Sequence, residues 1–282
     1  MASGRAETFA VLGATSLVGT PLLAQLAASG RRVIAYSRAP HADQPGVAWR
    51  LIGRAPTEPV DCWIGVAPIW TLSEHFALLE ASDAKRLVQL SSTSQFTKSA
   101  SSDPHETAIA RRLADAEEQV IAWAAARGIA WTILRPTLIH GAGRDRNVAE
   151  IARFIARFGF FPLFGRAQGL RQPVAADDVA RACLLAAQST AARHRAYDIG
   201  GGEVLPYRQM VRRIFSAAGR QPITPTVPLL AFRLALTVLH LFPRYRGWTP
   251  AMAERMNLDM VFDNAPAARD FGYAPKGFEP QV

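Results

Sequence analysis

The chain has 282 residues, of which 49% are apolar and 20% charged. This composition supplies enough apolar surface for a core and excludes a chain that is disordered over most of its length. Lys plus Arg number 32 against 23 Asp plus Glu, a formal net charge of +9. The arginines are scattered and form only short pairs, which argues against nucleic-acid binding and suits small anionic ligands. There are only three lysines and five tyrosines, so chemistry that needs either residue has few places to occur.

Neither the N-terminus nor the most apolar segment has the pattern of a membrane-directed sequence. Arg5 and Glu7 interrupt the N-terminal residues, and residues 228–243 contain Arg233 and His240. That segment is also shorter than the ~20 residues that span a bilayer. We therefore expect a soluble, cytoplasmic protein. Cys62 and Cys183 lie in apolar runs without metal-ligand spacing, which predicts buried free thiols and no metal site.

Short apolar runs alternate with helical segments along most of the chain. This order predicts an α/β fold, a Rossmann-type doubly wound parallel sheet with a smaller C-terminal substrate lobe. We expect residues 1–140 to form the dinucleotide-binding core, completed by about 168–200, and residues 141–167 and 201–282 to form the substrate-binding lobe. The expected strands are 8–12, 31–38, 60–68, 86–92 and 130–136, and the expected helices are 21–30, 105–127 and 177–188.

A glycine-containing turn follows the first expected strand, with Gly13 at its start and Gly19 at its end. Such a turn lets backbone N–H groups at a helix start meet a pyrophosphate. Ser16 stands at the usual middle glycine, which weakens the motif, and a purely structural turn is the alternative interpretation. The residues expected to bind the cofactor here are Gly13, Thr15, Ser16, Leu17, Val18 and Gly19.

The end of the second expected strand indicates which dinucleotide is bound. Ser37 and Arg38 stand there, and no acidic residue follows until Asp43. A carboxylate would bind the ribose hydroxyls of NAD, whereas Arg pairs with the 2′-phosphate of NADP. The sequence therefore favours NADP(H) over NAD(H). The alternative is that Arg38 is an ordinary solvated side chain.

Five segments in order resemble the short-chain dehydrogenase/reductase superfamily, in particular its extended and atypical branch of NAD(P)-dependent sugar epimerase/dehydratase-like proteins. They cover most of the chain: 13–19, 87–96, 133–143, 171–182 and 197–211. The resemblance implies that Ser92 is the catalytic hydroxyl, with Thr93 beside it. It also implies that Arg171 contacts a substrate phosphate and that Asp178 caps its helix. Further cofactor contacts implied by position are Ala67, Pro68, Ser91, Pro136 and Thr137.

The sequence departs from this family at its acid/base pair. The family uses Tyr-x-x-x-Lys on the long helix, where the Lys lowers the Tyr pKa. Glu117 or Glu118 sets the register and places the Lys position at Leu113 or Ala114 and the Tyr position at Ile109 or Ala110. No Tyr occurs between Tyr36 and Tyr197, and no Lys occurs between Lys98 and Lys276, so no alignment restores the pair.

Three interpretations follow from this departure. The chain is an oxidoreductase or epimerase-like enzyme in which His105 or His140 substitutes as acid/base, because His titrates near neutrality. Alternatively, it binds the nucleotide without turnover, as a sensor, scaffold or assembly factor. In the third, it reduces a substrate directly, with Ser92 or water supplying the proton. For both histidines, a structural role is the competing interpretation.

Two apolar segments flanked by arginines lie in the expected substrate lobe. Residues 151–164 predict an amphipathic helix with Phe154, Ile155, Phe158 and Phe161 on one face, and residues 229–241 are similar and precede Arg244 and Arg246. Packing on the core is the plain interpretation. An apolar substrate wall or a membrane-surface patch is the alternative. We thus expect a small-molecule substrate with anionic or apolar character and a possible peripheral membrane contact. The sequence leaves the oligomeric state open.

Overall fold

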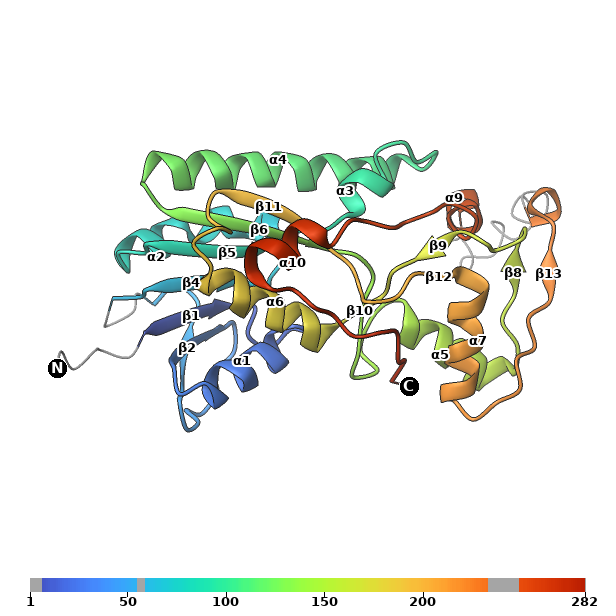
Figure 1. Ribbon diagram of the computed structural model, residues 1–282, viewed down its shortest axis with the longest axis horizontal. Helices are drawn as coiled ribbons and strands as arrows, with labels where there is room; N and C mark the ends of the chain where they lie inside the picture. The colour runs from blue at the N-terminus through green and yellow to red at the C-terminus, as the bar shows by residue number, and fades with distance from the viewer. Residues whose placement is uncertain (1–6, 55–58, 233–248, 282) are drawn as a thin grey trace.

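The computed structural model describes residues 7–54, 59–232 and 249–281, and its centre is a seven-stranded sheet (Figure 1). All six strand pairs are parallel. The order β11-β6-β5-β4-β1-β2-β3 reverses direction at β1, as in doubly wound folds. The strands are β1 (Thr8–Leu12), β2 (Arg32–Ser37), β3 (Val47–Leu51), β4 (Cys62–Gly65), β5 (Arg86–Leu90), β6 (Ala130–Pro136) and β11 (Arg195–Ile199). The predicted Rossmann-type fold is confirmed.

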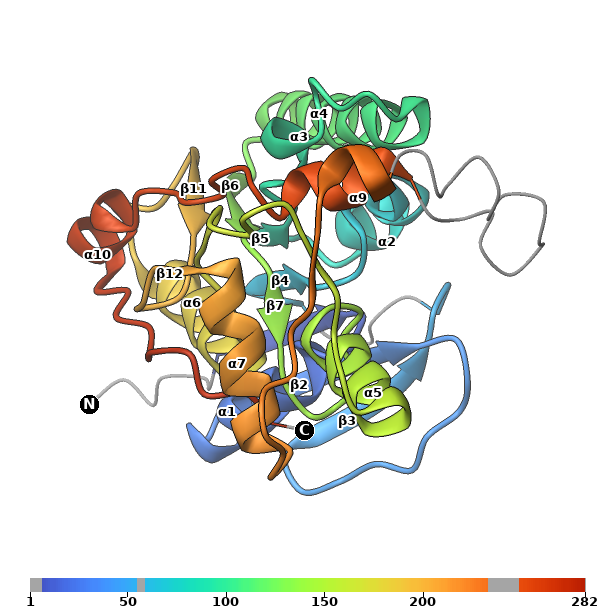
Figure 2. The same cartoon turned by 90° about the vertical axis from the view of Figure 1, so that its right-hand side faces the viewer.

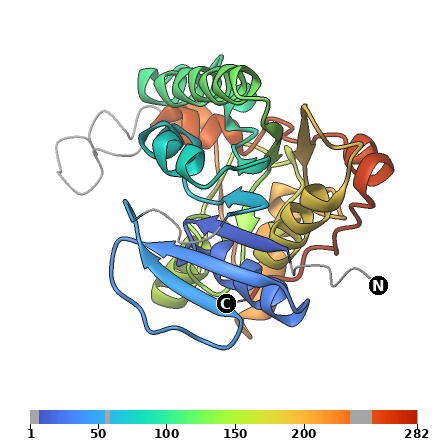
Figure 3. The ribbon, with the colours of Figure 1, turned by 90° about the vertical axis from the view of Figure 1, so that its left-hand side faces the viewer.

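Helices cover both faces of this sheet, as Figure 3 shows along the strands. Alternate residues of each strand point to opposite faces; Val11 packs in one core cluster and Leu12 in the other. One face carries α1 (Gly19–Ala28), α6 (Ala176–Gln188) and α10 (Ala265–Phe271). The other carries η1 (Ile69–His75), α2 (Phe76–Ala81) and α4 (Pro104–Ala126), with α3 (Ser94–Thr97) beside α4. The sheet is therefore buried on both sides, which matches the apolar runs in its strands.

Helix α4 is the longest helix described and extends along the top of Figure 1. Asp103 caps its first turn by accepting from the His105 N–H at 2.9 Å, and Pro104 occupies the first helical position. Its apolar residues recur at helical spacing and bury Leu113 and Val120 toward the sheet. The predicted bounds of 105–127 agree with this helix to one residue.

A smaller lobe, on the right in Figure 1, has its own apolar core, in which Ile155, Ile214 and Phe215 are fully buried. The short strands β7 (Ile139–His140) and β10 (Val174–Ala175) lie between it and the main sheet. The lobe contains α5 (Val148–Phe158), β8 (Leu163–Phe164), β9 (Leu170–Arg171), β12 (Leu205–Pro206), α7 (Tyr207–Ala217), β13 (Thr226–Val227) and α9 (Pro250–Arg255).

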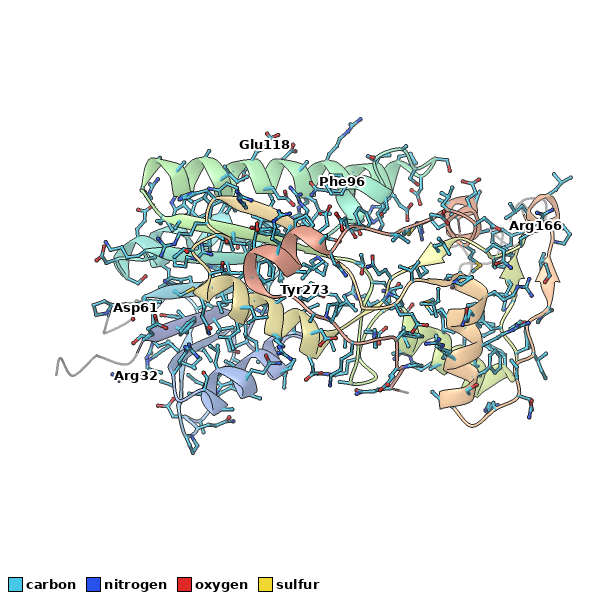
Figure 4. The ribbon with its side chains drawn as sticks, viewed as in Figure 1. Arg32, Asp61, Phe96, Glu118, Arg166 and Tyr273 are labelled. Atoms are coloured by element: carbon cyan, nitrogen blue, oxygen red, sulfur yellow. The ribbon has the colours of Figure 1, made fainter. Side chains whose placement is uncertain are left out.

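Within the expected lobe segment 201–282, α10 and Tyr273 pack on the main sheet core, whereas Met256 and Phe278 lie in the core of the small lobe. The Tyr197 hydroxyl donates to Asp270 at 2.7 Å, and the Tyr273 hydroxyl donates to the Gly200 carbonyl at 2.9 Å. Tyr273 is labelled in Figure 4. These contacts join residues 73 positions apart in each case, and local sequence patterns do not report such pairs.

The predicted amphipathic helix 151–164 is wrong at its C-terminal end. Helix α5 stops at Phe158, where Gly159 adopts φ +76° and ends the helix with a left-handed cap. Phe161 therefore lies in the following loop instead of on the helix. Of the second apolar segment, residues 233–241 lie outside the described residues, as do Arg5, Arg233, His240, Arg244 and Arg246.

The structure also bears on the two cysteines and on the search for membrane-spanning helices. Cys62 and Cys183 are buried and free, as predicted. Burial raises the pKa of the Cys62 thiol to about 12, so the thiol is protonated at neutral pH. Within the described part of the chain, no helix has the length and apolar character needed to cross a membrane.

Candidate active site at the carboxyl ends of the strands

The loop between β1 and α1 has the geometry of a phosphate-binding turn. Gly13 adopts φ +82°, and a Cβ there would lie 2.6 Å from the Ala67 backbone nitrogen. The Ser16 N–H donates to the Gly13 carbonyl at 2.9 Å, and the Ser16 hydroxyl accepts from the Gly19 N–H at 3.0 Å. Ser16 thus supports the turn in place of the usual glycine. Among the residues described, no acceptor lies within hydrogen-bond reach of the Leu17 and Val18 N–H groups.

A cleft of about 280 Å³ opens beside this loop, where β1, β4, β5 and β6 end. Its position is where open α/β sheets bind ligands. Most of its lining is apolar, and three serine hydroxyls are the polar exceptions. The described lining residues are Ser16, Leu17, Val18, Val66, Ala67, Pro68, Ile69, Trp70, Leu90, Ser91, Ser92, Leu113, Pro136 and Ile139.

Two of these serines follow β5 directly. The Ser91 N–H donates to the Leu134 carbonyl at 2.7 Å, which fixes the strand end, while the Ser91 hydroxyl is buried without a partner. The Ser92 hydroxyl accepts from the Ser94 N–H at 3.1 Å and keeps its own proton for another acceptor. The Thr93 hydroxyl is buried and donates to the Pro136 carbonyl at 3.2 Å. Ser91 and Ser92 therefore both line the cleft, although the Ser91 hydroxyl itself is buried, whereas Thr93 joins β5 to β6.

The structure favours one of the two registers of α4 that the sequence left open. Leu113 lines the cleft, and Ala114 is not among its lining residues. Four residues later, Glu117 is buried and accepts from the Arg135 Nε–H at 3.0 Å and from a terminal N–H of the same guanidinium at 2.6 Å. This arrangement favours the register in which the resemblance implies a Lys at Leu113 and a Tyr at Ile109. No side chain in the described lining of this cleft is an acid or a base that could replace that pair.

Neither candidate histidine lines the cleft. In β7, alternation turns Ile139 to the cleft and leaves His140 buried on the other side, with its ring 5.0 Å from that of Phe278. Both His140 ring nitrogens lack a partner, and burial lowers the pKa of His140 despite the nearby carboxylates of Asp145 and Asp178. His105 is exposed on the first turn of α4. This placement does not support His140 as the acid/base of the cleft.

The end of β2 presents positive charge and no free carboxylate. Ser37 is buried, and its hydroxyl accepts from the Ala39 N–H at 3.1 Å and contacts the His41 ring at 3.1 Å. Arg38 follows and is exposed. Asp43 is occupied, because it accepts from the Trp49 N–H at 2.7 Å and pairs with Arg50. No acidic side chain in this described segment is left to bind a ribose.

Ala67 and Pro68 lie between the cleft and a smaller cavity of about 30 Å³, to which Gly13, Ile52 and His75 also contribute. The two cavities together extend from the end of β3 to the end of β6. Pro136 lines the cleft, whereas Thr137 is oriented away, since its hydroxyl donates to the Gln172 carbonyl at 2.5 Å. A ligand longer than the cleft could therefore reach the smaller cavity past Ala67 and Pro68.

Two residues with roles implied by the resemblance have other partners here. Arg171 is buried, and its guanidinium donates to the backbone carbonyls of Leu170, Leu258 and Arg255. Its role as a substrate ligand stays a prediction. Asp178 was expected to cap α6, and this is wrong, because no side chain caps that helix. Instead Asp178 accepts from the Lys276 N–H at 2.9 Å and holds the C-terminal segment on the core.

Sequence reasoning missed five apolar lining residues of the site: Val66, Ile69, Trp70, Leu90 and Ile139. Ile69 and Trp70 start η1 directly after Pro68, and the Arg112 guanidinium lies 4.6 Å from the Trp70 ring centroid. A Trp so close to the end of a buried strand was the available signal. Together with Leu113, these residues make most of the lining apolar.

Comparison with known proteins agrees with this fold. Residues 71–200 match the model of the NAD dependent epimerase/dehydratase family. The 2-alkyl-3-oxoalkanoate reductase of Stenotrophomonas maltophilia (strain K279a) is 33% identical over 171 residues, which cover 57% of this chain and 51% of that protein. The chain thus spans about half the length of this curated relative.

Solved structures share the fold at low sequence identity. UDP-glucuronic acid 4-epimerase from Bacillus cereus in complex with NAD has a TM-score of 0.70 at 13% identity, over 96% of this chain and 92% of that one. UDP-glucose 4-epimerase from Thermotoga maritima with UDP-glucose has a TM-score of 0.63 at 17% identity, over 95% and 94%. The match over residues 71–200 agrees with the resemblance expected from the sequence, and the two solved sugar epimerases share the fold of this chain.

Proposed function

We propose that the chain is an NADP(H)-dependent reductase of a carbonyl group carried on an apolar chain. The observation that supports this proposal is the lining of the cleft, which combines serine residues with apolar side chains such as Leu113. Hydroxyls suit a carbonyl oxygen, and the apolar side chains suit hydrocarbon. The relative with 33% identity is named for reduction of 2-alkyl-3-oxoalkanoates, which combine these two parts.

The residues present fit a nicotinamide dinucleotide. The unpartnered N–H groups of Leu17 and Val18 would hold its pyrophosphate, and the unpartnered hydroxyl of Ser91 would meet a polar group deeper in the cleft. Ile52, Ala67 and Pro68 would flank the adenine side through the smaller cavity. The bound cofactor supplies a hydride, and the chain supplies binding, orientation and exclusion of water.

The form with a 2′-phosphate suits the end of β2 better than NAD. Arg38 is exposed there to meet the phosphate, and Ser37 and His41 lie beside it. The nearest carboxylate, Asp43, is already bound by Trp49 and Arg50. Solved relatives are in complex with NAD, so the preference for NADP(H) rests on these residues of the present chain alone.

An apolar substrate fits this cleft better than a sugar. Sugars need polar partners for their hydroxyls, and an unpaired buried polar group costs about 1–3 kcal/mol. Among the lining residues, Ile69 and Leu113 cannot supply such partners, and Trp70 has only its indole N–H. We therefore assign the alkyl part of the substrate to these side chains and its carbonyl oxygen to the Ser92 hydroxyl.

The described lining of the cleft contains no acidic or basic side chain, so the proton for the reduction has to come from another source. With His105 exposed and His140 behind β7, the interpretation in which a histidine substitutes for the family pair loses support. Ser92 then holds the substrate oxygen, and water delivers the proton as the carbonyl becomes an alcohol. This arrangement orients the substrate without general acid catalysis, which contributes about 10²–10⁴-fold in other enzymes, so slow turnover is expected.

A second candidate is a nucleotide-binding protein without turnover. Leu113 favours it, because an apolar residue stands in the cleft where the resembled family has its Lys. In this alternative the cleft binds the dinucleotide without consuming it, and the protein acts as a sensor, a scaffold or an assembly factor. The two candidates share the cofactor site and differ only in whether a carbonyl substrate is consumed.

NADPH oxidation with a 2-alkyl-3-oxoalkanoate as the probe substrate separates the candidates. The reductase account predicts turnover by the purified full chain and a fall of about 100-fold in kcat/KM for Ser92→Ala, because a hydrogen bond to the reacting oxygen is lost. Ser99→Ala is the matched control, since that hydroxyl is exposed and donates to the Phe96 carbonyl. NADPH binding without oxidation of any carbonyl tested would establish the second candidate.

A further inference from the structure

Four phenylalanines form a cluster on the surface of the small lobe. Phe154 is central, with ring centroids 4.6 Å from Phe158, 5.8 Å from Phe160 and 5.5 Å from Phe161. Ile223 lies against them, because the Phe161 N–H donates to the Ile223 carbonyl at 3.0 Å. These five residues are called the phenylalanine patch. It lies where α5 ends, beside the loop that follows α7. Figure 2 shows these two helices at the end of the molecule that faces the viewer.

The patch is more exposed than a core requires. Helix α5 already buries Ile151 and Ile155 in the lobe, yet Phe158 is 44% exposed and Phe160 37% exposed. Ile223 is 58% exposed. Contiguous aromatic surface of this kind marks an interaction site, since isolated apolar residues need no explanation but clusters do.

Arginines border the phenylalanine patch. Arg153 and Arg157 are exposed on α5, and the Arg157 guanidinium lies 5.3 Å from the Phe158 ring centroid. Arg220 follows α7 and donates to the Ile155 carbonyl at 3.3 Å, which places its cation on the same border. The nearest acid along α5 is Glu150, one turn before Phe154.

The excess of positive charge comes from two segments of the sequence. Residues 151–176 and 204–253 contain 11 arginines and no Lys, Asp or Glu. The rest of the chain has 21 Lys plus Arg against 23 Asp plus Glu. Arg166 extends from the far end of the small lobe in Figure 4. The formal charge of +9 therefore arises in these two segments, which include the exposed arginines of α5, and the remainder of the sequence is nearly neutral.

We propose that the phenylalanine patch docks the small lobe on an anionic lipid surface. Aromatic side chains that enter the headgroup region, bordered by basic residues, are the combination that binds peripheral proteins to such membranes. The Phe154 ring meets Phe160 and Phe161 edge to face, at 88° and 81°. A compact wedge of this kind suits insertion among acyl chains, whereas nucleic acid would need open ring faces for base stacking. This contact lies outside the cleft and is independent of the proposed reduction.

Cosedimentation of the full chain with phosphatidylglycerol vesicles tests this proposal, with phosphatidylcholine vesicles beside them. We expect binding to the anionic vesicles only, weakened by salt. Phe158→Gln/Phe160→Gln lowers the vesicle affinity by on the order of tenfold or more, because both exposed rings are removed. Arg153→Gln/Arg157→Gln lowers it by about 25-fold, at about fivefold per basic residue near the surface.

Arg181→Gln/Arg193→Gln is the matched control for charge. Both arginines are exposed on the sheet side of the molecule, so the same charge is lost without a change in the patch, and vesicle binding should fall less than twofold. The proposal is overturned if the wild-type chain does not sediment with anionic vesicles at low salt, or if the Phe variant binds as tightly as wild type. It is also overturned if the chain prefers single-stranded DNA over these vesicles and the DNA affinity depends on the same two rings. Thermal unfolding of each variant confirms that it is folded.

Discussion

Ser92 and Leu113 line the same cleft, one directly after β5 and the other on α4. A hydroxyl that can hold a substrate oxygen thus shares the site with an alkyl side chain, at one of the two positions where the resemblance implies a Lys. The proposed reductase function depends on this relationship. Ser92 remains to orient the substrate, whereas the Tyr-Lys pair that would transfer the proton is missing.

Restoring the family pair should accelerate the reaction. Ile109→Tyr/Leu113→Lys places a phenol and an ammonium one turn apart on α4, and the Lys lowers the Tyr pKa. We expect kcat to rise at least tenfold and to acquire a pH dependence, measured as NADPH oxidation at saturating substrate.

Ile109→Phe/Leu113→Lys is the matched control, with a ring of the same shape and no hydroxyl. It should leave kcat at or below the wild-type value. Equal gains in both double variants would contradict the assignment of proton transfer to the restored hydroxyl.

Arg38→Ala should weaken NADPH binding specifically. Loss of a charged hydrogen bond costs about 1.5–3 kcal/mol, so the Kd for NADPH should rise about 10- to 100-fold, while the Kd for NADH should hardly change. Fluorescence titration of both cofactors measures this. Wild-type chain that binds NADH more tightly than NADPH would overturn the argument from Arg38.

His140 should limit stability on the acid side. Its ordinary pKa is 6.5, and burial lowers it in the folded chain. Below pH 6.5 the unfolded chain therefore binds a proton that the folded chain does not, and stability falls as the pH drops toward the lowered pKa.

His140→Leu removes this loss, so we expect its Tm to fall less than that of wild type between pH 7 and pH 5. Its reductase activity at neutral pH should persist, because His140 does not line the cleft. Abolished turnover in a folded His140→Leu variant would return that residue to the mechanism.

The pair of Glu117 and Arg135 should matter for stability more than any surface pair. Their side chains are 5% and 19% exposed, and Gln95 also donates to Glu117, at 2.9 Å. Glu117→Ala leaves the Arg135 cation poorly compensated and should cost about 3–5 kcal/mol of unfolding free energy in urea.

Glu118→Ala is the control, since Glu118 is exposed on the outer face of α4 (Figure 4). That substitution should change stability by less than about 0.5 kcal/mol. Equal losses in the two variants would show that the buried pair contributes nothing special.

The sequence predicted the parts of the fold that local patterns determine. Apolar runs such as Thr8–Leu12 and Ala130–Pro136 were placed without error, because strands buried on both faces are apolar throughout. Strand β3 was missed, since at the sheet edge it is only partly buried and contains Arg50. The return of α10 to the sheet was missed because it depends on contacts such as Tyr197 with Asp270, far apart in sequence.

The site was predictable where chain order alone determines position. The serines after β5 and the loop from Gly13 to Gly19 lie at the strand ends, as expected. The catalytic role of His140 stays a prediction that its placement does not support. The orientation of β7 determines which of two adjacent residues lines the cleft, and a two-residue strand has no readable period. Whether Leu113 or Ala114 occupies the implied Lys position likewise depends on how α4 packs on the sheet, which the sequence does not show.

The pH profile of kcat tests the central claim most directly, measured as NADPH oxidation by the wild-type chain with a saturating 2-alkyl-3-oxoalkanoate between about pH 6 and pH 9. A cleft without a titrating side chain predicts a flat profile across this range. A profile that breaks at a single ionisation near neutrality would contradict it, because a side chain of the protein would then donate or accept the proton.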